Sequence, residues 1–373
     1  MSMSVPNGTQ DPQRATVLVL YTELAPYVLA CLNAFVETSG VDLHLVRWPV
    51  NKEAPFELAF HPRVTVHERT ALNDEQLLAL AHRIMPHMVI ASGWVDKGYL
   101  KVCRAMRKRG AVTVMSFDTA WRGDARQWVN MLLAPTWVSR TYSHAWVTGE
   151  AQANYAHRLG LGADRVRTGF YSADTSLFVP LGERLLAERN SAWPHRFLCV
   201  ARYIPTKGHQ LLCDAFAELC DEDQAGDWEL LLAGTGELHE QVMASSSGKH
   251  PRIQHRGFKP AKEMNDVVAQ SGVFVLPSTY EPWGVVVHEH GCAGLPLLLS
   301  SAVGAAERFL VEGENGYTAI AGDKETLKSM LRMFILSSDA ELTAMGRRSA
   351  DLGRAWSPAE WARTANELLH ATP

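Results

Sequence analysis

The stretch GVFVLPSTYEPWGVVVHEHGCAGLPLLLS, residues 272–300, sets the fold class of this chain. It opens with the apolar run 272–278 and closes with a second apolar run, 295–300. The segment VVVHEHGCA between the two runs can wind as a helix. Two short buried strands joined by a helix are typical of a parallel sheet that helices cover on both faces.

The same alternation of short apolar runs and helical segments extends through most of the chain. Further runs lie at 15–21, 41–47, 87–92, 111–117, 144–149, 196–201 and 228–234. Between Gly169 and Pro194 the alternation weakens, which indicates a domain boundary. We therefore predict an α/β protein with two doubly wound, Rossmann-like domains, residues 1–178 and 179–356, facing a cleft. Ser357, Pro358 and Glu360 then signal the start of a last helix within 357–373.

Composition bounds the function. The 373 residues include 47% hydrophobic and 20% charged residues, as expected for a folded globular protein. Lys and Arg total 36 against 40 acidic residues, for a net charge of -4, so we expect no general nucleic-acid binding. The six cysteines show no zinc-binding spacing and are expected to be reduced core residues.

Membrane contact is expected to be peripheral at most. No apolar run is long enough to cross a bilayer and the start of the chain lacks a signal-peptide pattern, so we expect a cytoplasmic protein. Arg104, Arg107, Lys108 and Arg109 place four cations on one predicted helix, which allows peripheral contact with the inner membrane face or is simply a solvated helix end.

Two glutamates flank the predicted helix start within the opening stretch. Glu281 lies before this start and Glu289 lies inside the helix. Free backbone N–H groups at a helix start suit a phosphate, and nearby carboxylates suit hydroxyl groups, so together they suggest a sugar phosphate. The alternative is that both glutamates only support the helix and its turn.

Cations follow the first strand of the second domain. Arg202 leaves the end of that strand, and Lys207 is predicted to begin the next helix. Alone, both would be interpreted as surface charges. Their position at a strand's carboxyl end, in the same domain as the two glutamates, favours a site that holds a diphosphate.

The N-terminal domain offers weaker signals. Asp118 follows the strand 111–117 and can reach the cleft or cap a turn. Trp121, Trp128 and Trp137 can line a groove by stacking on sugars, although core packing is expected for at least two of them. We expect no metal site at 288–290, because neighbouring helical residues point in different directions.

Taken together, these segments resemble the family 4 glycosyltransferases, which have the two-domain GT-B fold. The resemblance rests on E-P-W-G-V-V-V-H-E at 281–289, with its two glutamates separated by seven residues, on Arg202 and Lys207 in an R-x-x-x-x-K-G pattern, on LLLAGTGE at 230–237 and on VEGENGYTA at 311–319. It covers nearly all of residues 195–325 and is weaker in the first half.

The resemblance implies roles for particular residues. Arg202 and Lys207 would neutralise the diphosphate of a nucleoside diphosphate sugar in the C-terminal donor domain. Glu289 would bind ribose hydroxyls, and Glu281 would contact the transferred sugar. The remaining donor contacts would come from the backbone at Trp283, Gly284, Val285 and Val286 and, beside the base, from Arg256, Gly257 and Phe258.

On the acceptor side, the N-terminal domain would hold a glycan or a lipid-linked acceptor, with Asp118 orienting the acceptor or touching the donor sugar. The loop 22–27 departs from the paired glycines of many relatives. The resemblance further implies retention of the anomeric configuration, a role in cell-surface polysaccharide or glycoconjugate synthesis, and no cofactor or metal. The last helix would pack back on the N-terminal domain. The alternatives are a sugar-nucleotide epimerase of the same architecture and a non-catalytic nucleotide-sugar binding protein.

Overall fold

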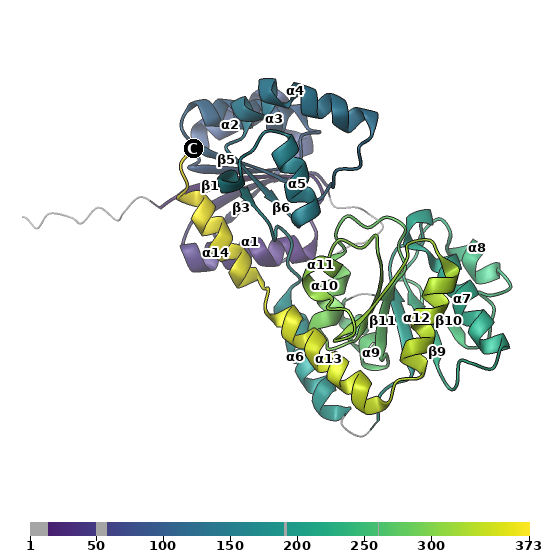
Figure 1. Cartoon of the computed structure of the whole chain (residues 1–373). Helices are drawn as coiled ribbons and strands as arrows, with labels where there is room; N and C mark the ends of the chain where they lie inside the picture. The colour runs from purple at the N-terminus through teal and green to yellow at the C-terminus, as the bar shows by residue number, and fades with distance from the viewer. Residues whose placement is uncertain (1–13, 50–57, 190–191, 260) are drawn as a thin grey trace, which may run out of the picture.

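The computed structural model describes residues 14–49, 58–189, 192–259 and 261–373, and it builds them into two domains around two parallel sheets (Figure 1). The N-terminal sheet has the order β3-β2-β1-β4-β5-β6-β7. Its strands are β1 (Thr16–Tyr21), β2 (Asp42–Arg47), β3 (Val64–Glu68), β4 (Met88–Ser92), β5 (Val112–Phe117), β6 (His144–Val147) and β7 (Val166–Arg167).

Helices cover both faces of this sheet. The helices are α1 (Pro26–Ser39), α2 (Asp74–Ile84), α3 (Lys97–Lys108), α4 (Ala125–Thr141) and α5 (Glu150–Arg158), with short 3-10 turns η1 (Arg69–Ala71) and η2 (Ala163–Arg165). Alternate side chains of β1 enter opposite cores, because Val17 and Val19 pack with α1 while Leu18 and Leu20 pack with α2 and α3. Burial on both faces explains why the strands are apolar along their whole length.

The C-terminal sheet has the order β10-β9-β8-β11-β12-β13. Its strands are β8 (Arg196–Val200), β9 (Glu229–Ala233), β10 (Ile253–His255), β11 (Val273–Leu276), β12 (Leu297–Ser300) and β13 (Gly316–Ala319). The helices of this domain are α6 (Thr175–Glu188), η3 (Pro205–Lys207), α7 (His209–Asp221), α8 (His239–Ala244), α9 (Ala261–Ala269), α10 (Val285–Cys292), α11 (Ala306–Phe309), α12 (Lys324–Ile335) and α13 (Asp339–Arg354).

All strand pairs in both sheets are parallel, and the strand order reverses beside β1 and beside β8. The fold prediction of two doubly wound α/β domains is thus confirmed. Ligands of such sheets bind outside the carboxyl ends of the strands at these reversal points.

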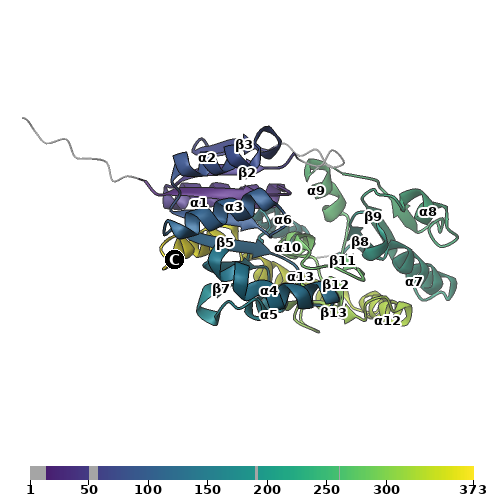
Figure 2. The same cartoon turned by 90° about the horizontal axis from the view of Figure 1, so that it is seen from above.

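The chain passes between the domains before α6 and again after α13 (Figures 1 and 2). The predicted boundary between residues 178 and 179 falls inside α6, whose Leu181 and Leu185 are buried in the C-terminal core. The boundary therefore lies a few residues earlier than predicted. The last helix, α14 (Pro358–Leu369), returns to the N-terminal domain, where it packs against α1 and Trp361 donates a hydrogen bond to the Phe170 carbonyl at 2.7 Å.

Candidate functional site

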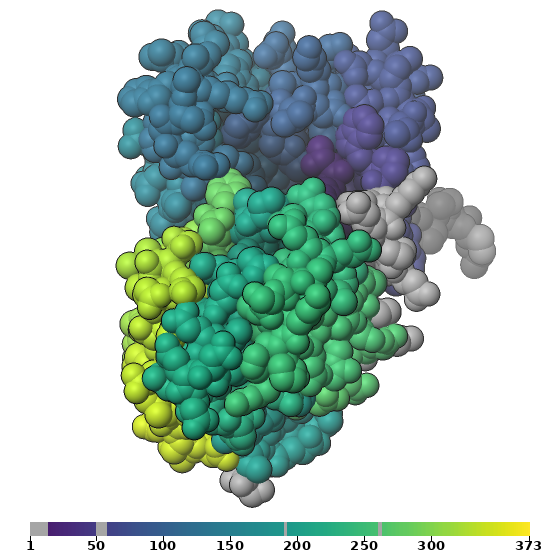
Figure 3. Space-filling model, turned by 90° about the vertical axis from the view of Figure 1, so that its right-hand side faces the viewer, coloured from purple at the N-terminus to yellow at the C-terminus, as the bar shows by residue number. Residues whose placement is uncertain are grey.

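A cleft of about 1680 Å³ separates the two domains. Loops that follow β1, β4 and β5 line it from the N-terminal domain, and loops that follow β8, β9 and β11 line it from the C-terminal domain. In the space-filling view the surface is hollowed where the domains meet (Figure 3). The cleft therefore lies at the carboxyl ends of both sheets, where the fold places ligands.

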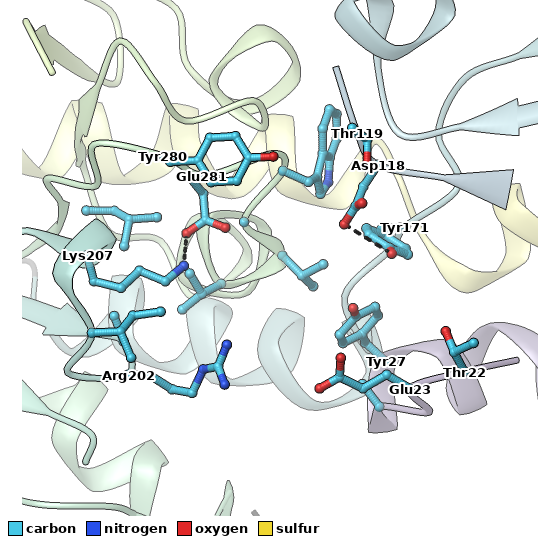
Figure 4. A pocket seen from close by; sticks show the side chains of 18 of the residues that line it. Thr22, Glu23, Tyr27, Asp118, Thr119, Tyr171, Arg202, Lys207, Tyr280 and Glu281 are labelled. Carbon is cyan, nitrogen blue, oxygen red and sulfur yellow. Dashed lines mark hydrogen bonds and ion pairs between the residues drawn. The ribbon is translucent and has the colours of Figure 1, made fainter. Parts of the chain in front are cut away.

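Two cations enter the cleft from the segment after β8. Arg202 and Lys207 both line it, and Lys207 forms an ion pair with Glu281 from the loop after β11 (Figure 4). Lys207 ends the 3-10 turn η3 instead of beginning α7 as predicted. Gly208 follows in the left-handed conformation with φ 72°, and a Cβ there would lie 2.4 Å from the Pro277 carbonyl oxygen. Only glycine lets this turn approach the β11 loop so closely.

The start of α10 faces the same space. Gly284 precedes the helix with φ 94°, and Gly284, Val285 and Val286 line the cleft. The first N–H groups of a helix have no partner within it, so this start offers donors and a partial positive charge to an anion. Trp283 also borders the cleft, but its side chain is buried in the C-terminal core.

Glu289 lines the cleft from the second turn of α10. Desolvation, with a smaller contribution from the nearby Asp174 carboxylate, raises the pKa of Glu289 to about 7. Within the part of the chain that the structure describes, its carboxylate accepts no hydrogen bond. A desolvated carboxylate without partners is suited to hydroxyl donors from a ligand.

Polar side chains of the N-terminal domain face these groups across the cleft (Figure 4). Asp118 lies 3.5 Å from the Tyr171 hydroxyl, and Glu23 and Tyr27 project from the loop and helix after β1. Burial raises the pKa of Asp118, and the Glu281 and Glu23 carboxylates add to this rise while the Tyr171 hydroxyl opposes it. This wall is rich in hydrogen-bonding groups and suits a polyhydroxylated ligand.

One side chain joins the two walls of the cleft. The buried Gln152 amide donates to the carbonyl of Asp118 and to the carbonyl of Pro282, both at 2.9 Å. Arg122 of the first domain and Tyr280 of the second also line the cleft, and the Arg122 guanidinium lies over the Tyr280 ring, 4.6 Å from its centroid. No motif in the sequence marks Gln152, Tyr171 or Tyr280. Gln152 and Tyr280 lie within three residues of predicted strand ends, and that position is the signal that could have found them.

The predicted base-side segment is only partly in the cleft. Phe258 lines the cleft and is 41% exposed. Arg256 and Gly257 are outside the cleft lining, because the Arg256 guanidinium turns to the Gln254 side chain at 2.7 Å and the Gly257 carbonyl accepts from Gly234. Of this predicted trio, the structure brings only Phe258 to the site.

The histidines beside Glu289 serve the helix itself. His288 accepts from the Ala173 N–H at 2.9 Å and donates to the Gly353 carbonyl at 2.8 Å, while His290 donates to the Val286 carbonyl at 2.7 Å. The two rings therefore point away from each other, as helical geometry predicts. Within the described ranges, no group of three His, Cys, Asp or Glu is arranged to hold a metal ion.

The three tryptophans divide between core and surface. Trp121 and Trp137 are partly buried against the N-terminal core, whereas Trp128 is 48% exposed on α4. Trp121 and Trp128 touch edge to face with ring centroids 5.4 Å apart. In the described part of the chain, the residues that line the cleft include none of these three tryptophans.

The fold and the cleft define a class: a GT-B protein whose facing Rossmann-like domains offer cations, a helix start and carboxylates to one ligand. Residues 189–350 match the family described as "Glycosyl transferases group 1". The match lies in the part of the chain where the sequence resembles glycosyltransferases, so the predicted resemblance is confirmed for residues 189–350.

Two curated relatives that match this chain are named as a glycosyltransferase and a mannosyltransferase. The chain is 28% identical over 233 residues to D-inositol 3-phosphate glycosyltransferase of Corynebacterium efficiens, covering 59% of this chain and 54% of that protein. It is 27% identical over 176 residues to the GDP-mannose-dependent alpha-(1-6)-phosphatidylinositol monomannoside mannosyltransferase of Mycolicibacterium smegmatis, covering 44% and 43%. The chain spans about half the length of these relatives.

The whole fold is shared with HepE of Anabaena, solved in complex with UDP and glucose. The TM-score is 0.69 at 16% identity, covering 95% of this chain and 99% of that one. Separately, no helix in the described part of the chain is long and apolar enough to span a membrane.

Proposed function

We propose that the protein transfers a sugar from a nucleoside diphosphate sugar to a hydroxyl group of an acceptor, with retention of the anomeric configuration. The observation that carries this proposal is the meeting of Arg202, Lys207 and the start of α10 on one side of a cleft whose other side presents Asp118. The likeness to group 1 glycosyltransferases supports it.

The donor would lie along the C-terminal domain. Its diphosphate would contact Arg202, Lys207 and the free N–H groups at the start of α10, and the ribose hydroxyls would donate to Glu289. Lys207 has three N–H donors, so it can keep its ion pair with Glu281 while it binds a phosphate oxygen. Glu281 is thereby fixed where it can accept from hydroxyls of the transferred sugar.

In this reaction the departing diphosphate takes the acceptor proton, so no side chain has to act as the base. The bond from the anomeric carbon to the diphosphate oxygen breaks, the bond to the acceptor oxygen forms on the same face, and the acceptor proton passes to the departing phosphate. Charge grows on the diphosphate as this bond breaks, so Arg202 and Lys207 bind the transition state more strongly than the ground state. With these cations present, we propose that no metal or other cofactor is required.

The acceptor would occupy the N-terminal wall, where Asp118, Glu23 and Tyr27 offer partners to its hydroxyls. We propose a glycan or a lipid-linked acceptor and a role in polysaccharide or glycolipid synthesis, in keeping with the names of the relatives. All six cysteines are free thiols, which supports a reducing compartment such as the cytoplasm.

The test is binding first and transfer second. We expect UDP or another nucleoside diphosphate, added at about 100 times its Kd, to stabilise the protein by about 2.7 kcal/mol, and we expect Arg202→Ala to abolish most of this effect. Glu281→Ala should leave nucleotide affinity nearly unchanged while transfer falls by orders of magnitude. Glu240→Ala, an exposed residue on α8, is the matched control.

The outcomes separate the alternatives. Donor turnover without any acceptor would indicate an epimerase, and tight nucleotide binding without sugar release to any acceptor would indicate a binding protein. The NMR coupling of the anomeric proton in the product reports the stereochemistry, and an inverted product would overturn the retaining mechanism. Absence of stabilisation by every nucleotide and nucleotide sugar tried would reject the proposal as a whole.

A further inference from the structure

Helix α4 carries a strip of exposed apolar side chains that the core does not use. Trp128, Val129, Leu132 and Leu133 are between 48% and 71% exposed. They recur at intervals of three and four residues, so they share one face of the helix. We call these four residues the apolar strip. A contiguous group of large apolar side chains on a helix surface is typical of a binding face.

A cluster of cations continues this face. Arg104, Arg107 and Lys108 of α3 and Arg140 of α4, with Thr136 and Ser139, line a cavity of about 640 Å³, here called the basic hollow. Among the described residues none of these four cations forms an ion pair. Neither α3 nor α4 contains an acidic residue. The positive charge of the basic hollow is therefore not neutralised by its own helices.

The apolar strip runs into the basic hollow. Leu132 and Leu133 precede Thr136 by four and three residues, so their side chains lie one turn from the wall of the hollow. An apolar face beside unpaired cations matches the interface of an anionic bilayer, where apolar side chains enter the acyl boundary and cations meet phosphates. We propose that the apolar strip and the basic hollow together dock this protein on an anionic membrane surface.

Charge argues for a membrane over a second copy of this chain. A twofold dimer on this face would bring two basic hollows together, and the like charges would repel each other. A lipid surface supplies both partners that the face lacks, which are a negative charge and an apolar layer of unlimited extent. The overall charge of -4 does not oppose this docking, because the cations are concentrated on one face.

Docking would place the membrane beside the cleft. The opposite side of the first turns of α4 contributes Arg126, Gln127 and Asn130 to the cleft lining, while the apolar strip faces outward. In Figure 1, α4 lies on the outer edge of the N-terminal domain, the domain to which the acceptor is assigned. This inference about the acceptor rests on the proposed function: the arrangement favours a lipid-linked acceptor over a free glycan.

The experiment is flotation of the full chain with vesicles. Equimolar phosphatidylcholine and phosphatidylglycerol vesicles should bind the protein, pure phosphatidylcholine vesicles should bind it weakly, and added salt should release it. Each cation near such a surface contributes about a fivefold change in partitioning, so Arg104→Gln/Lys108→Gln should weaken binding about 25-fold. Leu132→Glu/Leu133→Glu should weaken it by about tenfold or more.

Matched controls lie on the other domain. Lys249→Gln/Arg332→Gln removes two exposed cations, and Met333→Glu/Leu336→Glu places two charges at exposed apolar positions, one in α12 and one at its C-cap. Both controls should bind vesicles like the unchanged protein. Circular dichroism establishes that each variant is folded.

Three results would overturn the proposal: equal binding to neutral and anionic vesicles, equal losses in the control variants, or self-association without lipid that Leu132→Glu/Leu133→Glu abolishes. The last result would assign the face to a second copy. Thermal stabilisation by UDP is measured on the same samples. Vesicle binding without nucleotide binding would reject only the proposed function. Nucleotide binding without vesicle binding would reject only the membrane docking.

Discussion

Replacing Glu289 with glutamine should make the ligand-free protein more stable at neutral and alkaline pH. The carboxylate lies desolvated in the cleft, which raises its pKa from the ordinary value of 4.5 to about 7. A group whose folded pKa is raised binds more protons in the native state, so native stability falls as pH rises from 4.5 to 7. Glutamine of the same shape carries no charge and avoids this loss.

The size of the effect follows from the pKa. One pKa unit corresponds to about 1.4 kcal/mol, so the full gain of Glu289→Gln is about 3 kcal/mol at pH near 8 and about 1.5 kcal/mol near pH 5.5. For a domain of this size, about 3 kcal/mol raises Tm by roughly 6–12 °C. Urea unfolding of both proteins at each pH, followed by tryptophan fluorescence, measures the difference directly.

The control is Glu240→Gln, which removes an exposed glutamate from the same domain and should change stability little at any pH. A gain for Glu289→Gln that is equal at both pH values would refute the desolvation argument, and so would no gain at all. The same variant should bind nucleotides about 10-fold to 100-fold more weakly, because ribose hydroxyls lose a charged acceptor. Together the two results would show a residue that costs stability and serves binding.

Three further results are expected. Trp361→Ala removes a fully buried ring that joins α14 to the N-terminal core and should cost about 3–5 kcal/mol of unfolding free energy in urea titrations. Gly284→Ala places a Cβ 3.1 Å from the Glu281 side chain at φ 94°, so it should lose about 1–3 kcal/mol of stability and slow donor turnover. Acid should unfold the C-terminal domain. Burial lowers the pKa of His209, His288 and His290 to about 4, so stability is lost as pH falls from 6.5 toward 4. Circular dichroism during an acid titration measures this loss.

The interior of each sheet could be predicted from sequence because parallel strands that are buried on both faces are continuously apolar. The strands β3 and β13 were not predicted. Both lie at a sheet edge, where partial exposure breaks the apolar run: β3 reads VTVHE and β13 reads GYTA, and neither is buried along its whole length. Helix α6 was also missed, because Pro180 and Gly182 interrupt its pattern, although tertiary packing buries one face.

In the candidate site, residues next to strand ends could be predicted from the sequence. The contacts between side chains from distant parts of the chain could not. Arg202, Lys207 and Asp118 follow strands, and the fold brings all three to the cleft. The contacts of Gln152 join it to residues 34 and 130 positions away, a pairing that no local pattern encodes. Arg256 follows a strand too, yet its side chain finds a closer partner in Gln254, so position alone overestimates the site.

Helix α10 links the donor side of the cleft to both segments that cross between the domains. Its His288 ring accepts from Ala173, just before α6, and donates to Gly353, at the end of α13. The ring must be neutral to do both, and burial lowers its pKa to about 4, so the neutral form is fixed near neutral pH. The start of the same short helix faces the cleft. A phosphate bound at the start of α10 therefore contacts the same helix that holds the two interdomain segments in place.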